Sequence, residues 1–308
     1  MINCPVCESK NVIFYNESRD IEYFSSSKLY RYYSCKSCDV IFLLNPPSDI
    51  SKIYPKSYYS FNESNNNLYF FFNAIKNYLE NQMFKKILKK IKKKKIYCLD
   101  IGGGSGWISK NLVQADQRIK KITIVDIVSP NIMNTNQNPK IDFVKSKIEN
   151  FKTKKKYDFV LLLNLIEHVP NPDLVLAKIR NLLNPNGICL IKTPNHRSLN
   201  NLIFKNLYWG GLHCPRHFVI FSFKSFLSIC KKSKLAIVDY KFTQGFPQWH
   251  ASFIGSLRRR KILRKKIPIH RHISWILIFP FAIFFDFLIL KWIGISDQIF
   301  YVLKKNKS

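Results

Sequence analysis

A run of glycines at residues 100–106, Asp-Ile-Gly-Gly-Gly-Ser-Gly, constrains this chain more than any other stretch. The apolar residues 96–99 before it predict a buried strand, and residues 108–113 after it can begin a helix. Glycine has no Cβ, so a strand–turn–helix of this kind lets bare backbone and a helix N-terminus approach a ligand. The segment predicts an α/β turn that binds a nucleotide-type ligand, with an ordinary tight turn of another α/β protein as the alternative.

The spacing of the glycines separates two classes of ligand. A dinucleotide site requires G-x-G-x-x-G, and counting from Gly102 or Gly104 places Trp107 or Ser109 at the third glycine position. Neither frame fits. The chain instead has an acidic residue followed by glycines at every second position up to Gly106. This pattern resembles motif I of the class I S-adenosylmethionine-dependent methyltransferases.

Later segments follow the order of that family. Residues 121–126 are expected to form the second strand and end in Asp126, whose carboxylate can accept both hydrogen bonds of a ribose diol. The sequence Asn164-Leu165-Ile166-Glu167-His168 resembles the family's motif after strand four. The other expected elements are strands at 141–144, 157–163, 188–193, 235–241 and 297–303, and a helix at 173–183. We expect an α/β fold with a seven-stranded, Rossmann-like class I methyltransferase sheet.

The resemblance implies that S-adenosyl-L-methionine is the cofactor. Its expected binding residues are Asp100, Gly102, Gly104, Gly106, Asp126 and Asn164. Asp126 matches the acid that holds the ribose in the family. One departure is Lys147, which stands about where many members carry an aspartate against the adenine ring. Backbone and apolar neighbours are therefore expected to contact the adenine instead.

Two C-x-x-C pairs near the start of the chain predict a zinc ribbon. Cys4 and Cys7 form the first pair, and Cys35 and Cys38 form the second. Four thiolates in two such turns are the ligand set of a tetrahedral structural Zn²⁺. Strands are expected between them, and the metal is expected to stabilise folding without taking part in catalysis. Redox chemistry and unrelated free thiols are the alternatives.

The remaining cysteines and the start of the chain bear on localisation. The other four of the eight cysteines stand singly in apolar runs, which predicts buried hydrophobic side chains: Cys98, Cys189, Cys214 and Cys230. Cys4 precedes any apolar region of a signal peptide. We therefore expect a cytoplasmic protein, either free or peripheral on the inner face of the cytoplasmic membrane.

The charge is extreme, with 50 basic and 19 acidic residues and a net charge of +31. Nucleic acid and an anionic membrane surface are the partners that such a charge suggests. A coding bias that replaces surface residues by lysine gives the same composition without any partner. A nucleic-acid-binding ribbon would need basic and aromatic residues interleaved on one face. Arg31 and the tyrosines at 30, 32 and 33 suit that pattern, but they suit a strand packed on a neighbour equally, and nucleic acid is the less favoured partner.

Residues 213–217 read His-Cys-Pro-Arg-His, and a serine able to cap a helix follows shortly. The passage resembles a segment near the substrate pocket of many small-molecule methyltransferases. Two histidines and an arginine are costly to bury without partners. They predict a general base, His213 or His217, with Arg216 holding an anionic acceptor group, or a hydrogen-bond cluster that only fixes the loop. His168 is an alternative base.

Residues 251–296 form a basic and hydrophobic insert. Arginines and lysines cluster at its start, and a largely apolar stretch of 18 residues follows at 273–290. A full membrane span needs about 20 apolar residues, and Pro280 and Asp286 interrupt this one. We expect an interfacial anchor that places basic residues on anionic headgroups. A hydrophobic lid and a dimer interface are the alternatives.

The chain is thus expected to consist of five segments. They are a zinc ribbon at 1–45, a linker and a covering helix at 46–95, the S-adenosylmethionine-binding domain at 96–250, the insert at 251–296, and the final strand and tail at 297–308. The predicted function is methylation of a small or lipid-linked metabolite, such as a surface-polysaccharide sugar or a quinone precursor. An RNA-modifying methyltransferase and a non-catalytic, membrane-attached protein of the same fold remain open.

Overall fold

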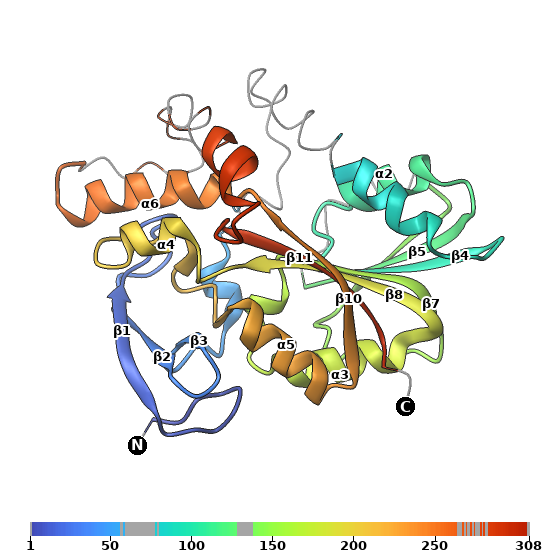
Figure 1. Ribbon diagram of the computed structural model, residues 1–308, viewed down its shortest axis with the longest axis horizontal. Helices are drawn as coiled ribbons and strands as arrows, with labels where there is room; N and C mark the ends of the chain where they lie inside the picture. Colours follow the sequence, from blue (N-terminus) through green and yellow to red (C-terminus); the bar gives the residue numbers. More distant parts are fainter. Residues whose placement is uncertain are drawn as a thin grey trace.

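The structure is a computed structural model that describes residues 2–55, 58, 78, 80–127, 138–263, 267, 269, 272, 274, 278, 280 and 283–306. It contains a seven-stranded sheet and a smaller four-stranded sheet. Figure 1 shows the small sheet beside the strand ends of the large one. The prediction of an α/β fold with an N-terminal antiparallel module is therefore confirmed.

The large sheet has the strand order β10-β11-β8-β7-β4-β5-β6. Its strands are β4 (Ile96–Ile101), β5 (Ile119–Asp126), β6 (Ile141–Lys145), β7 (Tyr157–Leu163), β8 (Leu183–Pro194), β10 (Leu235–Thr243) and β11 (Gln298–Lys305). Strands β4 to β8 pair in parallel, whereas β11 runs antiparallel to both of its neighbours. Every expected strand of this sheet is present, within a few residues of its expected ends.

Helices cover both faces of the large sheet, which explains its apolar central strands. One face packs against α2 (Trp107–Ala115) and the helical residues 80–89. The other packs against α3 (Pro172–Leu182) and α5 (Phe223–Lys232). Leu161 of β7 packs in the first layer and Leu162 in the second. The expected covering helix over 68–91 is described only in its second half, because residues 59–77 lie outside the described part.

The small sheet has the order β1-β2-β3-β9. Its strands are β1 (Val12–Ser18), β2 (Tyr30–Cys35), β3 (Val40–Leu43) and β9 (Val219–Phe221). Strands near β1 and β2 were expected, whereas β3 and β9 are new. All the side chains of β3 are buried, so β3 lacks the alternation that marks a half-exposed strand. Because β9 pairs with β3, the N-terminal module is joined to the segment that follows residues 213–217.

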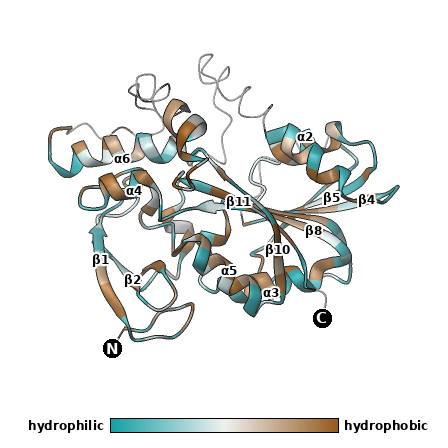
Figure 2. Ribbon diagram, viewed as in Figure 1, coloured by the Kyte–Doolittle hydropathy of each residue, from teal (hydrophilic) through white to brown (hydrophobic). Residues whose placement is uncertain are grey.

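The insert lies beside α4 (Leu199–Phe204) at one end of the molecule (Figure 1). It contains α6 (Phe246–Arg259) and a short π-helix, η7 (Ile283–Leu290), which Figure 2 colours mainly as hydrophobic. Much of the predicted basic and apolar anchor lies outside the described residues, including Arg264–Lys266 and most of 273–282. Within the part that is described, no helix has the length and apolar character needed to cross a membrane.

Candidate active site

The glycine turn follows β4 and begins α2. Gly102, Gly104 and Gly106 have φ angles of 73°, 53° and 74°, a left-handed conformation that residues with a Cβ rarely adopt. Gly106 is the N-cap of α2. The alternate spacing noticed in the sequence therefore has a direct conformational cause, and it brings the bare backbone of the turn to the edge of the sheet.

Asp100, near the end of β4, connects the strand to α2 on the other side of this turn. Its side chain is 2% exposed and accepts a hydrogen bond of 2.8 Å from the Ser109 hydroxyl in the first turns of α2. Burial raises the pKa of Asp100 to about 6. Asp100 and Gly106 lie outside the lining of the cavity described below, whereas the predicted cofactor residues Gly102, Gly104, Asp126 and Asn164 line it.

Asp126, at the end of β5, is held against the glycine turn. One of its carboxylate oxygens, Oδ2, accepts a hydrogen bond of 2.9 Å from the backbone N–H of Gly104. Asp126 ends one of the parallel strands of the large sheet. The carboxyl ends of these strands meet at one edge of the sheet, which is the usual position of a ligand in such folds. The arrangement leaves a carboxylate at the cavity wall that can accept hydrogen bonds from a diol.

A cavity of about 720 Å³ opens at this edge, a size suited to a small organic cofactor. Its lining combines the glycine turn with Lys147, Glu149 and Asn150, which follow β6. Lys147 therefore lies on the cavity lining after β6, the position expected for it from the sequence, and its neighbours in the chain form the same part of the lining. Further along, the lining includes Tyr54, Tyr58, His168 and Phe218.

The segment after β7 orders the floor of the cavity. Asn164 has a φ of 57° and donates a hydrogen bond of 3.3 Å from Nδ2 to Oε1 of Glu167. Glu167 is fully buried and also accepts a hydrogen bond from the Thr193 hydroxyl at 3.0 Å. Burial raises the pKa of Glu167 to about 7. The motif that the sequence singled out therefore forms a linked polar group next to the cavity.

Three predicted histidines meet beside Glu167. The ring centroids of His168 and His217 are 4.6 Å apart, and those of His213 and His217 are 5.1 Å apart. Nδ1 of His168 lies 3.0 Å from the carbonyl oxygen of Arg216, and Nδ1 of His217 lies 2.7 Å from that of Gly211. The Tyr54 hydroxyl also lies 2.8 Å from Nδ1 of His168, and a hydroxyl can accept as well as donate. A carbonyl can only accept, so a proton on Nδ1 satisfies the contacts of both rings and leaves a lone pair on Nε2.

Burial keeps these two rings neutral. Burial, together with a smaller contribution from the neighbouring His213, lowers the pKa of His168 to about 3. It also lowers the pKa of His217 well below the usual range, with His168 and His213 adding to the effect. Neutral imidazoles can accept protons or bind metal. Glu167, His168 and His217 each offer one atom within 4.8 Å of the others, a spacing at which a metal ion could be held.

His213 is held by residues from outside its own loop. Its Nδ1 lies 2.7 Å from Oε2 of Glu22, between β1 and β2, and its Nε2 lies 3.1 Å from the Tyr58 hydroxyl. Glu22 also accepts a hydrogen bond from the Tyr208 hydroxyl. Because a carboxylate can only accept, Nδ1 of His213 is the protonated nitrogen and Nε2 accepts from Tyr58. Tyr58 in turn lines the cavity.

Arg216 is fully buried and forms an ion pair with Asp20 at 2.8 Å. Burial alone would raise the pKa of Asp20, but the Arg216 guanidinium holds it below its usual range. The guanidinium also stacks over the Tyr23 ring at 4.5 Å. Arg216 lies outside the cavity lining, so its contacts are those of a residue that fastens the N-terminal module to the loop of residues 213–217.

Sequence reasoning missed the partners that the N-terminal module and the segment after it supply: Asp20 and Glu22 from the module, and Tyr54 and Tyr58 from the following segment. One signal was present. Acidic residues are scarce in this chain, and Asp20 and Glu22 stand two positions apart in a stretch with no predicted element. Acids retained in so basic a chain are candidates for buried partners of arginine and histidine.

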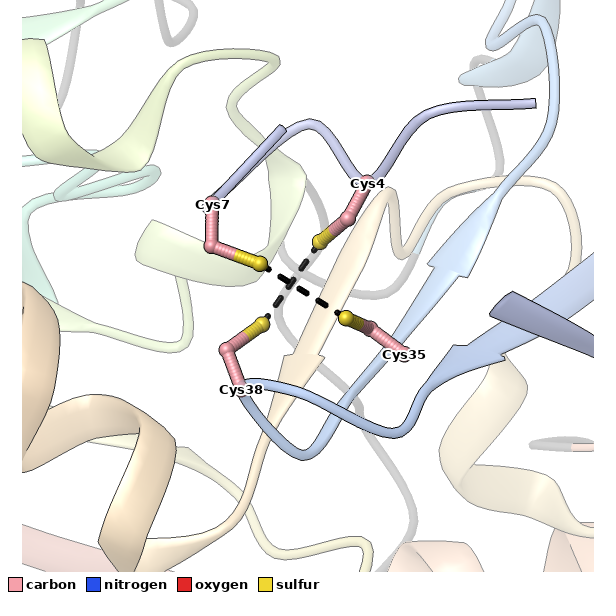
Figure 3. A group of neighbouring side chains, drawn as sticks. All are labelled: Cys4, Cys7, Cys35 and Cys38. Atoms are coloured by element: carbon pink, nitrogen blue, oxygen red, sulfur yellow. Dashed lines mark hydrogen bonds between the residues drawn. The ribbon is translucent and has the colours of Figure 1, made fainter. Parts of the chain in front are cut away.

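The four predicted zinc ligands converge in the N-terminal module. The Sγ atoms of Cys4 and Cys38, and those of Cys7 and Cys35, are each 3.6 Å apart, and all four lie within 4.8 Å of one another. Figure 3 shows the four sulfurs pointing at a common centre. Zn–S bonds of about 2.3 Å in a tetrahedron place sulfurs about 3.8 Å apart, so this donor set fits Zn²⁺. The other four cysteines are buried thiols, as expected.

A family model described as a methyltransferase domain matches residues 75–240. The chain belongs to this family. The matched range contains the glycine turn, Asp126, the segment after β7 and the loop of residues 213–217. The prediction from the sequence motifs is therefore confirmed at the level of family and fold, and S-adenosylmethionine is the cofactor of that family.

Curated relatives of this methyltransferase match a shorter stretch. A protein named ubiquinone biosynthesis O-methyltransferase from Rickettsia bellii (strain OSU 85-389) is 34% identical over 102 residues, covering 32% of this chain and 41% of that protein. A protein of the same name from Rickettsia canadensis is 33% identical over 106 residues, covering 33% of this chain and 44% of that protein. The chain spans about two fifths of the length of these relatives.

One solved structure supports the fold. It is described as a "putative sarcosine dimethylglycine methyltransferase" from Galdieria sulphuraria, with 15% identity and a TM-score of 0.52. The match covers 74% of this chain and 85% of that one. Similarity at this identity concerns the architecture of the sheet and its helices alone.

Proposed function

We propose that the protein transfers a methyl group from S-adenosylmethionine to a small or lipid-linked metabolite. The observation that carries the proposal is that one cavity is lined both by the expected cofactor-binding residues and by residues able to accept a proton. Gly102, Gly104 and Asp126 form its cofactor part, and Tyr58 and His168 stand on the same lining. S-adenosylmethionine supplies an electrophilic methyl group on a sulfonium, so the protein must align the acceptor and remove its proton.

The contacts of His213 support a route for that proton. Tyr58 can take the acceptor's proton on its oxygen while giving its own proton to Nε2 of His213, 3.1 Å away. The imidazolium that forms keeps its Nδ1–H on Glu22, whose negative charge balances it. His168 is the alternative, because its Nε2 carries a lone pair and its ring lines the cavity directly. His217 lies behind it, against Glu167 and Gly211.

The class of acceptor is supported by the apolar and aromatic part of the lining and by the names of the relatives. Tyr54, Tyr58, Ile50 and Phe218 suit a ring or a prenyl chain better than a phosphate-rich polymer. The relatives named for ubiquinone biosynthesis favour a quinone precursor within this class. A lipid-linked sugar fits the same lining. RNA is the second candidate, favoured only by the charge of +31.

Attachment to an anionic membrane is the matching proposal for localisation. Trp292 and Ile293, just after η7, are 79% and 62% exposed, and Phe284 of η7 is 53% exposed. Lys291 lies next to Trp292, with its Nζ 5.0 Å from that ring. Exposed tryptophan beside lysine is typical of a membrane–water interface. A membrane-bound enzyme would meet an apolar acceptor where that acceptor is concentrated.

The test uses S-adenosylmethionine with a labelled methyl group, protein, and vesicles of anionic phospholipid that contain a cellular lipid extract. We expect label in the lipid fraction and flotation of the protein with the vesicles. The double variant Trp292→Ser/Ile293→Ser should float several-fold less, because it loses exposed apolar area. Ile13→Ser, an equally apolar and half-exposed change on β1, is the control. Label in added RNA, with strongly salt-dependent binding, would contradict the proposal.

We also propose that Cys4, Cys7, Cys35 and Cys38 hold a structural Zn²⁺. The convergence of four sulfurs on one centre supports it. The ion would fix the two turns that flank β1 and β2. Asp20 and Glu22 lie on the connection between these strands. The metal would therefore help to position these two acids, which contact the loop of residues 213–217.

Replacing Cys35 by serine is expected to lower the bound zinc from about one equivalent to near zero, since a hydroxyl is a poor zinc ligand beside three thiolates. The β1–β3 module should then become sensitive to protease and the thermal midpoint should fall. Metal analysis and limited proteolysis measure this. Cys189→Ala, a buried thiol of β8 outside the cluster, should keep its zinc. Zinc retained in Cys35→Ser would contradict the assignment.

A further inference from the structure

Two buried carboxylates meet at the junction between the insert and the large sheet. Asp286 of η7 is 0% exposed, and Asp297, directly before β11, is 1% exposed. No lysine, arginine or histidine forms an ion pair with either one within the described part of the chain. An isolated buried charge is costly, and two of the same sign are costlier. A compensating group is therefore required.

The two carboxylates belong to one small polar cluster at the start of α6. The backbone N–H of Gly245 donates to Oδ2 of Asp286 at 2.6 Å. A Cβ at Gly245 would overlap the Cβ of Asp297 and lie 2.7 Å from Oε1 of Gln248. Asn200 of α4 donates from Nδ2 to Oδ2 of Asp297 at 2.8 Å. Both acids and both amides thus converge from α4, the start of α6, η7 and the residue before β11.

Each of these four side chains keeps one oxygen without a hydrogen bond among the described residues. The atoms are Oδ1 of Asp286, Oδ1 of Asp297, Oε1 of Gln248 and Oδ1 of Asn200. Gln248 is 6% exposed and Asn200 is 1% exposed. Buried oxygen acceptors almost always have a partner, so four unpartnered ones in a single cluster indicate a ligand. The Trp249 indole and the Ser198 hydroxyl also interact with Asp286 and Asp297, and the oxygens that remain call for a ligand that oxygen atoms can hold.

We infer that Asp286, Asp297, Gln248 and Asn200 form a site for a hard divalent cation, Ca²⁺ or Mg²⁺. Carboxylate and amide oxygens are the ligands that both ions prefer, and a charge of +2 neutralises the two acids. One proton shared by the acids would leave both amide oxygens unsatisfied. A water molecule donates only two hydrogen bonds and neutralises nothing.

The position of the site gives the ion a structural role. The backbone N–H of Asn195, directly after β8, donates to the carbonyl of Asp297 at 2.8 Å. Figure 1 shows α4, the start of α6 and η7 gathered around the start of β11. The ion would therefore fasten the insert to the central strands β8 and β11. This role is independent of the proposed methyl transfer and of the thiolate zinc site.

The test uses the full-length protein after passage over a chelating resin, with metal analysis to verify that zinc is retained. Titration with CaCl₂ or MgCl₂ is expected to show saturable binding in calorimetry and to raise the thermal midpoint by roughly 5 °C near saturation. Separate titrations distinguish the two ions. Absence of binding and of any midpoint shift with both ions would overturn the proposal and favour a shared proton.

Variants decide which oxygens bind. Asp286→Asn and Asp297→Asn should abolish the cation-dependent shift, whereas Asp239→Asn on the exposed side of β10 should retain it. Gln248→Met keeps both acids and removes one oxygen, so it should weaken binding about tenfold. This variant carries the test if the acid variants fail to fold. Unchanged affinity in Gln248→Met and Asp286→Asn would place the ion elsewhere and overturn the assignment.

Discussion

Asp126→Asn is expected to weaken the binding of S-adenosylmethionine about 100-fold. The Asp126 carboxylate lies at the cavity wall and accepts a hydrogen bond through Oδ2 from the backbone N–H of Gly104, and we expect it to accept from the ribose hydroxyls of the cofactor as well. An asparagine amide can keep the contact to Gly104, but its NH₂ group cannot accept from a hydroxyl. Loss of hydrogen bonds to a charged group costs about 1.5–3 kcal/mol, and about 2.7 kcal/mol corresponds to 100-fold in affinity.

Calorimetric titration with S-adenosylmethionine and S-adenosylhomocysteine measures this loss, and NAD tests the class of ligand. Asp142→Asn is the matched control, since this acid lies on the next strand, half exposed, and pairs with Lys121. It should bind both compounds as the unaltered protein does. Equal affinity in Asp126→Asn would remove the ribose role. Binding of NAD would mean that the spacing of the glycines was misinterpreted.

The central sheet was predictable because its chemistry is local. Parallel strands covered on both faces must be apolar along their length, and β7 reads Tyr-Asp-Phe-Val-Leu-Leu-Leu. The glycine turn is equally local, since three left-handed backbone positions permit little except glycine. The spacing of the two C-x-x-C pairs was sufficient to predict that the four thiols meet, because metal ligands have characteristic spacings. In each case a short stretch carried the whole signal.

The partners of the histidines were not predictable in this way. Glu22 and His213 are 191 residues apart, and long-range contacts such as the pairing of β3 with β9 and the ion pair of Asp20 with Arg216 bring their segments together. β3 has four residues, too few to show a period. Asp100 illustrates a different limit. The motif indicated its importance, but whether an acid contacts the cofactor or supports the turn depends on Ser109, which no spacing rule singles out.

The insert shows how composition can hide a polar site. Its apolar stretch was read as a surface for membrane, and Asp286 as an interruption. The structure buries Asp286 beside Asp297 and the start of α6 instead. An acid within an apolar segment is expensive to bury unless something compensates for it. An acidic residue within an apolar segment therefore indicates a buried partner, and it should not be interpreted only as an interruption of a membrane anchor.

His213→Gln is expected to lower the turnover number by about 10²–10⁴-fold, the usual contribution of a general base, with the dissociation constant of S-adenosylmethionine unchanged. The glycine turn and Asp126, where we expect the cofactor to bind, do not contact this ring through any hydrogen bond among the described residues. Glu22→Gln should lower turnover less, about tenfold, because an amide oxygen can still accept from Nδ1 but carries no charge to balance an imidazolium. Glu17→Gln, an exposed acid on β1, is the control.

The pattern over four variants separates the possible bases. If turnover falls in His213→Gln, Glu22→Gln and Tyr58→Phe while cofactor affinity holds, the proton leaves through Tyr58 and His213. If it falls only in His168→Gln, the base is the ring that lines the cavity itself. A general loss of cofactor binding in all of them would indicate that the cluster only fixes the loop. The ion pair of Arg216 with Asp20 joins that loop to the N-terminal module, so these two charges have a structural role even without proton transfer.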